Sequence, residues 1–259
     1  MLTVTMTPHL LGFAVTGDYD ELNNLYDAVH TLVGDLDDGA LSMGEAIARE
    51  RLLALCYDLR HASMGNRSVR MVDNGMDRDK AEWLGIALPP LKNLNYVVEV
   101  LYPEAMYEVM MLGGLIRMRE SELTKKGGTV FDGMSDPRIV FDPVCCEVRR
   151  YQSLVMEAIH AQTTPATFVR IRKQVVEGER TVSSMYTQWL DMVNIDWCGM
   201  TQKKRQSSMS TIVRDISDYA TDLSYVKMAK DIDKFVEEQG CPRVNVRLTG
   251  IDYPEDYEW

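Results

Sequence analysis

The sequence of 259 residues predicts a helix-rich α+β protein with a small mixed or antiparallel sheet, several packed helices and one long C-terminal helix. Three observations support this fold class. Helix starts carry clear capping signals, candidate strands are few and lie mostly in the first part of the chain, and residues 207–239 contain neither glycine nor proline. The composition, 46% hydrophobic and 26% charged, excludes collagen, disulfide-rich scaffolds and wholesale disorder.

Two capping boxes and two prolines mark the starts of four helices. In a capping box, the first side chain accepts a hydrogen bond from a free amide of the first turn, and an acid three residues later returns one. Proline is tolerated at the first helical position because an N–H there would have no helical partner. The four signals are Asp18 with Glu21, Ser42 with Glu45, Asp142 before Pro143, and Thr164 before Pro165.

Five segments have the composition or alternation of strands: residues 2–6, 10–16, 68–72, 94–102 and 243–249. The last of them alternates most cleanly, with Val244, Val246 and Leu248 on one side. Residues 129–131 and 139–141 are separated by turn-forming residues and predict a hairpin. The predicted sheet is therefore small relative to the helices.

The chain divides into four predicted parts. They are an α+β part with acidic N-terminal helices (1–123), a loop or hairpin connection (124–143), a mainly helical part ending in a strand (144–251), and an acidic aromatic tail (252–259). The connection is rich in glycine, lysine and proline, which favours a boundary. The alternative is that residues 1–123 and 144–251 form one continuous domain.

The net charge of −11 is distributed unevenly along the chain. Residues 1–66 carry ten acids and three bases, which gives −7, and the last eight residues carry −4. Residues 67–251 therefore sum to zero and include basic clusters, such as Lys203 to Arg205. The case against a nucleic-acid partner rests on the absence of a binding motif and of aromatic residues interleaved with these bases, rather than on net charge.

The sequence predicts a cytoplasmic protein without a membrane segment. The N-terminus has no basic and apolar signal pattern, and no apolar run approaches the ~18 residues that span a bilayer. The five cysteines include no C-x-x-C pair, which is typical of a reducing compartment.

Two features near the C-terminus predict contacts with another protein or a second copy. Apolar residues of the long helix follow alternating steps of three and four, the pattern of a helical seam. These residues are Met209, Ile212, Ile216, Tyr219, Leu223 and Val226. The tail adds Tyr253, Tyr257 and Trp259 among acids. The alternative for both features is packing within the chain itself.

Three of the four histidines follow a carboxylate by three residues, so each pair shares a helix face. The pairs are Asp27 with His30, Asp58 with His61, and Glu157 with His160. Such pairs on bundled helices are used to hold metal ions, which makes them candidate ligands of a divalent metal, the one cofactor we consider. The alternative is structural, because a histidine in the last turn of a helix interacts favourably with the helix dipole.

No sequence motif identifies a catalytic residue: there is no phosphate-binding glycine loop, no serine elbow and no complete calcium loop. We therefore expect a non-enzymatic cytoplasmic interaction or regulatory protein that acts through helical surfaces and the acidic aromatic tail, and that self-associates or binds a protein partner. The alternative is a metal-dependent hydrolase or oxidase that uses the three carboxylate–histidine pairs.

Overall fold

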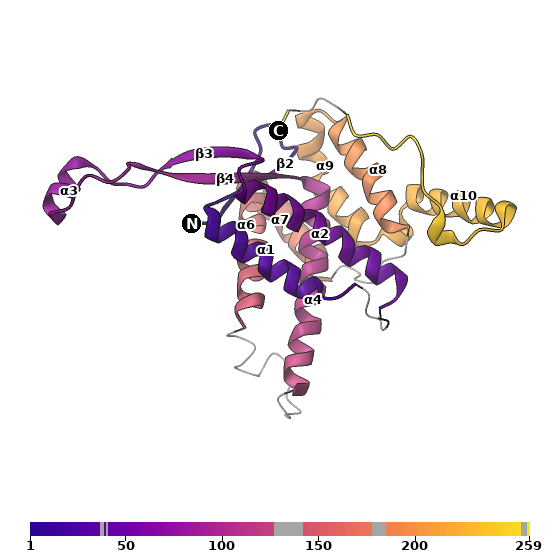
Figure 1. Cartoon of the computed structure of the whole chain (residues 1–259). Helices are drawn as coiled ribbons and strands as arrows, with labels where there is room; N and C mark the ends of the chain where they lie inside the picture. The colour runs from indigo at the N-terminus through magenta and orange to yellow at the C-terminus, as the bar shows by residue number, and fades with distance from the viewer. Residues whose placement is uncertain (37–38, 40, 127–141, 178–184, 255–257) are drawn as a thin grey trace.

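The computed structural model describes residues 1–36, 39, 41–126, 142–177, 185–254 and 258–259. It confirms the helix-rich α+β class: nine α-helices and one four-stranded sheet lie within these residues. Figure 1 shows helices packed around the inner part of the sheet, from which a long two-stranded ribbon projects.

The first elements follow the predicted order. Strands β1 (Thr3–Met6) and β2 (Gly12–Gly17) form a hairpin, and helices α1 (Tyr19–Val33) and α2 (Met43–Ser63) follow. Both capping boxes are present, at Asp18 and at Ser42. The capping signals therefore predicted both helix starts correctly.

All four strands pair antiparallel, in the order β1-β2-β4-β3. Strands β3 (Ser68–Asp73) and β4 (Lys92–Leu101) confirm two further predicted strands. Strand β2 lies in the centre, and all six of its residues are buried. Gly12 is required where β2 meets β4, because a Cβ atom there would lie 1.9 Å from the Val100 carbonyl oxygen.

Helix α4 (Tyr102–Lys126) begins directly after β4 and supplies much of the core. Helices α6 (Pro143–Gln162), α7 (Pro165–Glu177) and α8 (Tyr186–Cys198) follow among the described residues. Arg119 of α4 donates two hydrogen bonds, of 2.9 and 2.8 Å, to the carboxylate of Asp142, the residue that caps α6. One hydrophobic core includes buried residues from 1–123 and from 144–251.

The prediction of one long helix over residues 207–239 is wrong. Helix α9 (Gln202–Ser217) ends before a short 3₁₀ turn, η2 (Tyr219–Thr221), and α10 (Leu223–Gln239) then begins. Asp222 caps α10, because its carboxylate accepts hydrogen bonds from the amides of Ser224 (2.8 Å) and Tyr225 (3.1 Å). The break also places the Tyr219 ring 4.5 Å from the ring of Tyr186, inside the aromatic core.

The break divides the predicted helical seam. Its first four members are buried inside this chain: Met209, Ile212, Ile216 and Tyr219. Leu223 is 84% exposed and Val226 is half-buried. The seam therefore does not present one continuous apolar stripe on the surface.

The predicted strand over residues 243–249 is also wrong. The segment begins with a 3₁₀ turn, η3 (Arg243–Asn245), and pairs with no strand among the described residues. The side-chain amide of Gln188 provides the hydrogen bonds that a strand would have provided. It donates to the Val246 carbonyl (3.0 Å) and accepts from the Leu248 amide (2.7 Å). The predicted hairpin at residues 129–141 lies outside the described residues.

Within the described part of the chain, no helix combines the length and the apolar character that a bilayer span requires. All five cysteines are free thiols, and Cys56, Cys145 and Cys198 are buried.

The break at Asp222 leads to a test of helix capping. We expect Asp222→Ala to lower the free energy of unfolding by about 1 kcal/mol, because two amides of the first turn of α10 lose their acceptor. Asp231→Ala, at an exposed position in the middle of the same helix, is the matched control and should change stability by less than about 0.5 kcal/mol. Urea denaturation measures both. An equal effect of the two substitutions would show that Asp222 does not act as a cap.

Candidate functional site

The three carboxylate–histidine pairs lie where the sequence placed them, in the last turns of α1, α2 and α6. The structure does not combine them into one site: among the described residues, no group of three or more His, Cys, Asp or Glu side chains could hold a metal ion. Each ring instead contacts an aromatic neighbour, His30 with Tyr26, His61 with Tyr57, and His160 with Phe168.

The carboxylates of these pairs are also separate. Asp58 forms an ion pair of 2.7 Å with Arg67, while Asp27 and Glu157 are exposed on other helices. The three histidines lie in the last turns of three different helices.

A polar network centred on Arg51 connects three helices. Its guanidinium donates two hydrogen bonds, of 2.8 and 2.6 Å, to the carboxylate of Glu104 in α4, and forms a 2.8 Å ion pair with Asp191 in α8. Asn194, also in α8, donates to Glu104 (2.8 Å). Burial alone lowers the pKa of Arg51, but the two carboxylates outweigh this effect and raise the pKa.

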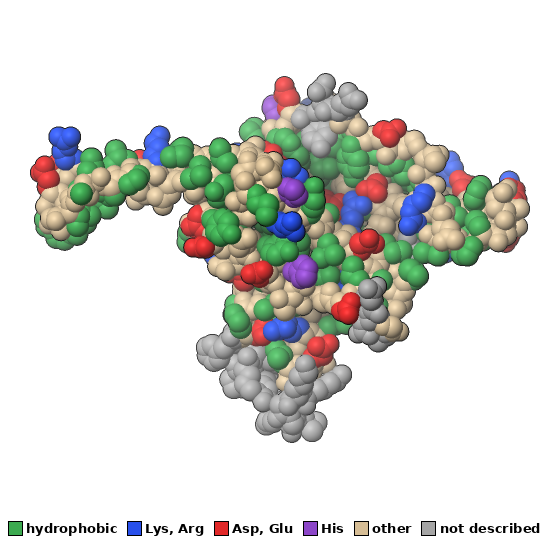
Figure 2. All heavy atoms as spheres, in the orientation of Figure 1, with side chains coloured by type: hydrophobic (Ala, Val, Ile, Leu, Met, Phe, Trp, Pro, Cys, Tyr) green, Lys and Arg blue, Asp and Glu red, His purple; other side chains and the backbone are tan. Residues whose placement is uncertain are grey.

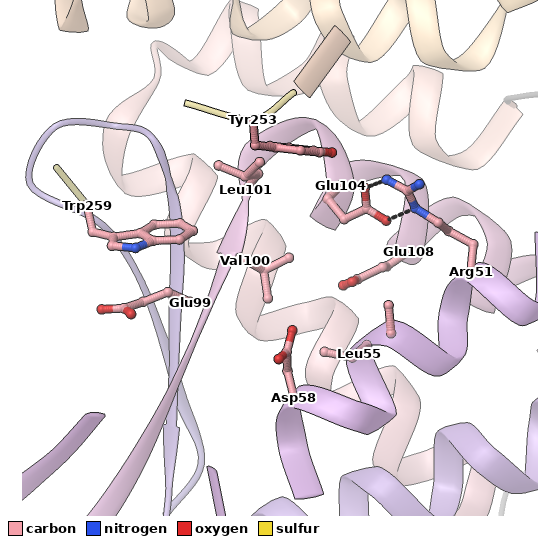
Figure 3. Close-up of a pocket in the computed structure, with 11 residues that line it drawn as sticks. Arg51, Leu55, Asp58, Glu99, Val100, Leu101, Glu104, Glu108, Tyr253 and Trp259 are labelled. Carbon is pink, nitrogen blue, oxygen red and sulfur yellow. Dashed lines mark hydrogen bonds and ion pairs between the residues drawn. The ribbon is translucent and has the colours of Figure 1, made fainter. Parts of the chain in front are cut away.

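A cavity of about 290 Å³ lies beside this network, between α2, α4, β4 and the C-terminal tail. Figure 3 shows the carboxyl groups of Asp58 and Glu108 directed into it. Glu108 is 3% exposed, and one of its oxygens accepts a 2.8 Å hydrogen bond from the hydroxyl of Tyr151. Burial, aided by the negative charge of Glu104, raises the pKa of Glu108 well above 4.5, so its carboxyl group favours the neutral form.

The C-terminal tail covers one side of the cavity. The Tyr253 hydroxyl donates to Asp191 (2.9 Å) and accepts from Asn194 (3.3 Å), and Trp259 packs against the core. The Nε2 atom of His9 lies 3.3 Å from a carboxylate oxygen of Glu258. The described tail residues Tyr253 and Trp259 therefore dock on their own chain, whereas Tyr257 lies outside the described residues.

The residues that line the cavity provide carboxyl groups, one arginine and two aromatic rings, but no serine, cysteine or histidine. The titratable side chains of this lining are therefore its carboxyl groups, Arg51 and Tyr253. The network holds three helices and the tail together, which is a structural role.

The most distinctive surface is the ribbon that projects from the sheet. We call residues 68–94 the arm: it comprises β3, the short helix α3 (Arg78–Leu84) at the tip, and the outer part of β4. Strand β3 packs extensively only against β4, and α3 packs extensively against no other described helix or strand. Figure 1 shows the arm extending well beyond the other elements.

The arm exposes large apolar side chains along its length. The pairing of Val69 with Tyr96 and of Met71 with Leu94 places these four on one face of the ribbon. Trp83 at the tip is 85% exposed. Eight other large apolar residues of the arm are 42–58% exposed: Val69, Met71, Val72, Leu84, Ile86, Leu88, Leu91 and Leu94. Figure 2 shows these hydrophobic side chains distributed over the arm.

Patches of this kind mark interaction surfaces, since monomeric proteins rarely leave so much contiguous apolar area in water. Sequence reasoning predicted both strands of the arm but not their pairing. A signal was available: residues 83–91 contain Trp, Ile and three Leu residues together with Gly and two Pro residues, between two predicted strands.

The Arg51 network predicts a strong dependence of stability on this side chain. We expect Arg51→Met to lower the free energy of unfolding by about 3 kcal/mol, because Glu104 and Asp191 lose their cation in a largely buried site. Arg214→Met is the matched control: Arg214 is 58% exposed, pairs with the adjacent Asp215, and should contribute less than about 1 kcal/mol. Urea denaturation compares the two, and similar losses would contradict the special role of Arg51.

Glu108 predicts a specific pH dependence. The pKa of Glu108 is raised in the folded state, so above about pH 4.5 the native protein keeps a proton that the unfolded chain has released. The contribution of Glu108 to the free energy of unfolding therefore falls as pH rises. Glu108→Gln removes this titration. We therefore expect the stability of the variant, relative to the wild type, to increase between about pH 5 and about pH 8.

Chemical denaturation across this pH range measures the effect of Glu108→Gln. Glu237→Gln, at an exposed position of α10, provides the baseline for removing one negative charge. A difference between wild type and Glu108→Gln that does not change with pH would contradict the assignment.

Comparison with known proteins provides one match. No curated protein and no solved structure matches the chain significantly. One family, described as a domain of unknown function (DUF6904), matches residues 2–259, which is all of the chain except its first residue. The chain therefore belongs to the DUF6904 family.

Proposed function

We propose that this protein is a non-enzymatic interaction protein that binds a protein partner through the arm. One observation carries the proposal: nine large apolar side chains are exposed on a projecting element that contributes little to its own fold. Burying such side chains on association gives a favourable free energy of about 25 cal/mol per Å² before the costs of binding are subtracted.

The charge of the arm favours a protein over a membrane or a nucleic acid. Residues 68–94 contain four acids and four bases, so the arm is neutral. Anionic lipid surfaces and phosphate backbones attract surfaces with an excess of bases, which the arm lacks. A neutral, apolar surface with an exposed tryptophan is typical of a protein interface, where Trp is enriched among the residues that dominate binding.

We assign the interaction to the arm rather than to the helical seam and the aromatic tail, which the sequence suggested. Most of the helical seam packs inside the chain, and Tyr253 of the tail is bonded to Asp191 and Asn194. We place this function in the cytoplasm, in agreement with the five free cysteines, which suit a reducing compartment.

Site-specific photocrosslinking in the native host tests this proposal. A photoreactive phenylalanine analogue replaces Leu88, which is 47% exposed on the arm. We expect one discrete protein adduct, which is lost when Trp83→Ser is added to the same chain. The same probe at position 223, where Leu223 is 84% exposed on α10, is the matched control and should give no such adduct.

Two outcomes would overturn the proposal. One is the absence of any protein adduct from position 88 above the level at position 223. The other is binding of the purified protein to anionic lipid vesicles that depends on Trp83, which would assign the arm to a membrane surface.

A further inference from the structure

We infer that the partner of the arm is the arm of a second copy of this chain, packed antiparallel across a two-fold axis. This inference rests on the proposed function and names its partner. In such a contact the same patch is used on both copies, so a single interface covers both arms.

The size of the exposed surface suits this arrangement. The nine apolar residues together expose an area on the order of 900 Å², and each partner in a standard interface buries about 800 Å². Because Val69, Met71 and Leu94 lie on one face of the ribbon and Val72 on the other, the second copy has to contact more than one face of the arm to bury an area of this size.

The charges of the arm complement each other when two arms are antiparallel. Its root carries Arg70, Asp73 and Lys92 and sums to +1. Its tip sums to −1, from Asp77, Arg78, Asp79, Lys80 and Glu82. An antiparallel arrangement places each tip beside the other root, where the opposite charges attract.

The described residues outside the arm, which we call the body, offer an apolar surface at the root of the arm that can receive the tip of the other copy. Tyr57 and Met64, in and just after the last turns of α2, are each 59% exposed, and β3 begins four residues after Met64. In the antiparallel dimer, Trp83 and Leu84 of one copy cover this surface on the other. The interface is thus continuous from the arm to the end of α2.

Analytical ultracentrifugation of the purified full chain tests the inference. We expect the wild type to sediment with twice the monomer mass of 29.5 kDa. Trp83→Ser should raise the dimer dissociation constant roughly 30-fold or more, because a tryptophan that becomes buried on association contributes strongly to binding. Leu223→Ser removes an equally exposed apolar side chain outside the arm and should leave the dissociation constant within about threefold of the wild type. Circular dichroism confirms that both variants fold.

Disulfide formation tests the antiparallel arrangement. In a background with the exposed Cys146 changed to Ser, one chain carries Met64→Cys and a second, differently tagged chain carries Leu84→Cys. We expect mild oxidation to link these two chains by a disulfide. In the control mixture, Leu223→Cys replaces Leu84→Cys, and we expect only a background yield of linked chains. Equal yields of linked chains from the two mixtures would overturn the tip-to-root arrangement.

A wild-type chain that stays at 29.5 kDa at the highest soluble concentration overturns the inference of a second copy. If the probe at position 88 then forms an adduct with a different protein, the proposed function of the arm stands and only the identity of the partner changes. If the probe forms no adduct, both proposals fail.

Discussion

The ion pairs of Arg51 hold together the parts of this fold that are most distant in sequence. One guanidinium joins α2 to Glu104 of α4 and to Asp191 of α8, and Asp191 in turn holds Tyr253 of the tail. Charges removed from water are costly unless every partner is present, so each of these elements depends on the others being in place. Glu108 lies next to them and is 3% exposed, and this burial raises the pKa of its carboxyl group.

The body and the arm divide the structure into two parts with different purposes. The body buries its large aromatic side chains, including Trp189, Trp197 and Tyr102, and completes its core without the arm. The arm does the opposite, because its apolar side chains face water over most of its length. Large exposed apolar patches of this kind are typical of surfaces that another molecule covers, which is the basis of the association proposed for the arm.

Local chemistry explains which predictions from the sequence were correct. Capping boxes, prolines at helix starts and alternating strands depend on residues close together in the chain, so α1, α2, α6 and four strands could be predicted. The long helix failed because its periodicity continues through Tyr219, while packing against Tyr186 and capping by Asp222 divide it. The strand at 243–249 failed because the side chain of Gln188, which is distant in sequence, satisfies its backbone.

The sequence by itself determined the helix-rich class, the starts of α1, α2 and α6, the four strands and the placement of three histidines at helix ends, since each depends on contacts within a few residues. Only the tertiary structure decided which apolar residues are buried. Burial depends on how elements pack, so the seam residues became core, while Trp83 and Leu94 stayed exposed on the arm. The tertiary structure also separated the carboxylate–histidine pairs and assembled the Arg51 network. Residue spacing shows which side chains share a helix face, but it does not show which neighbouring element that face contacts.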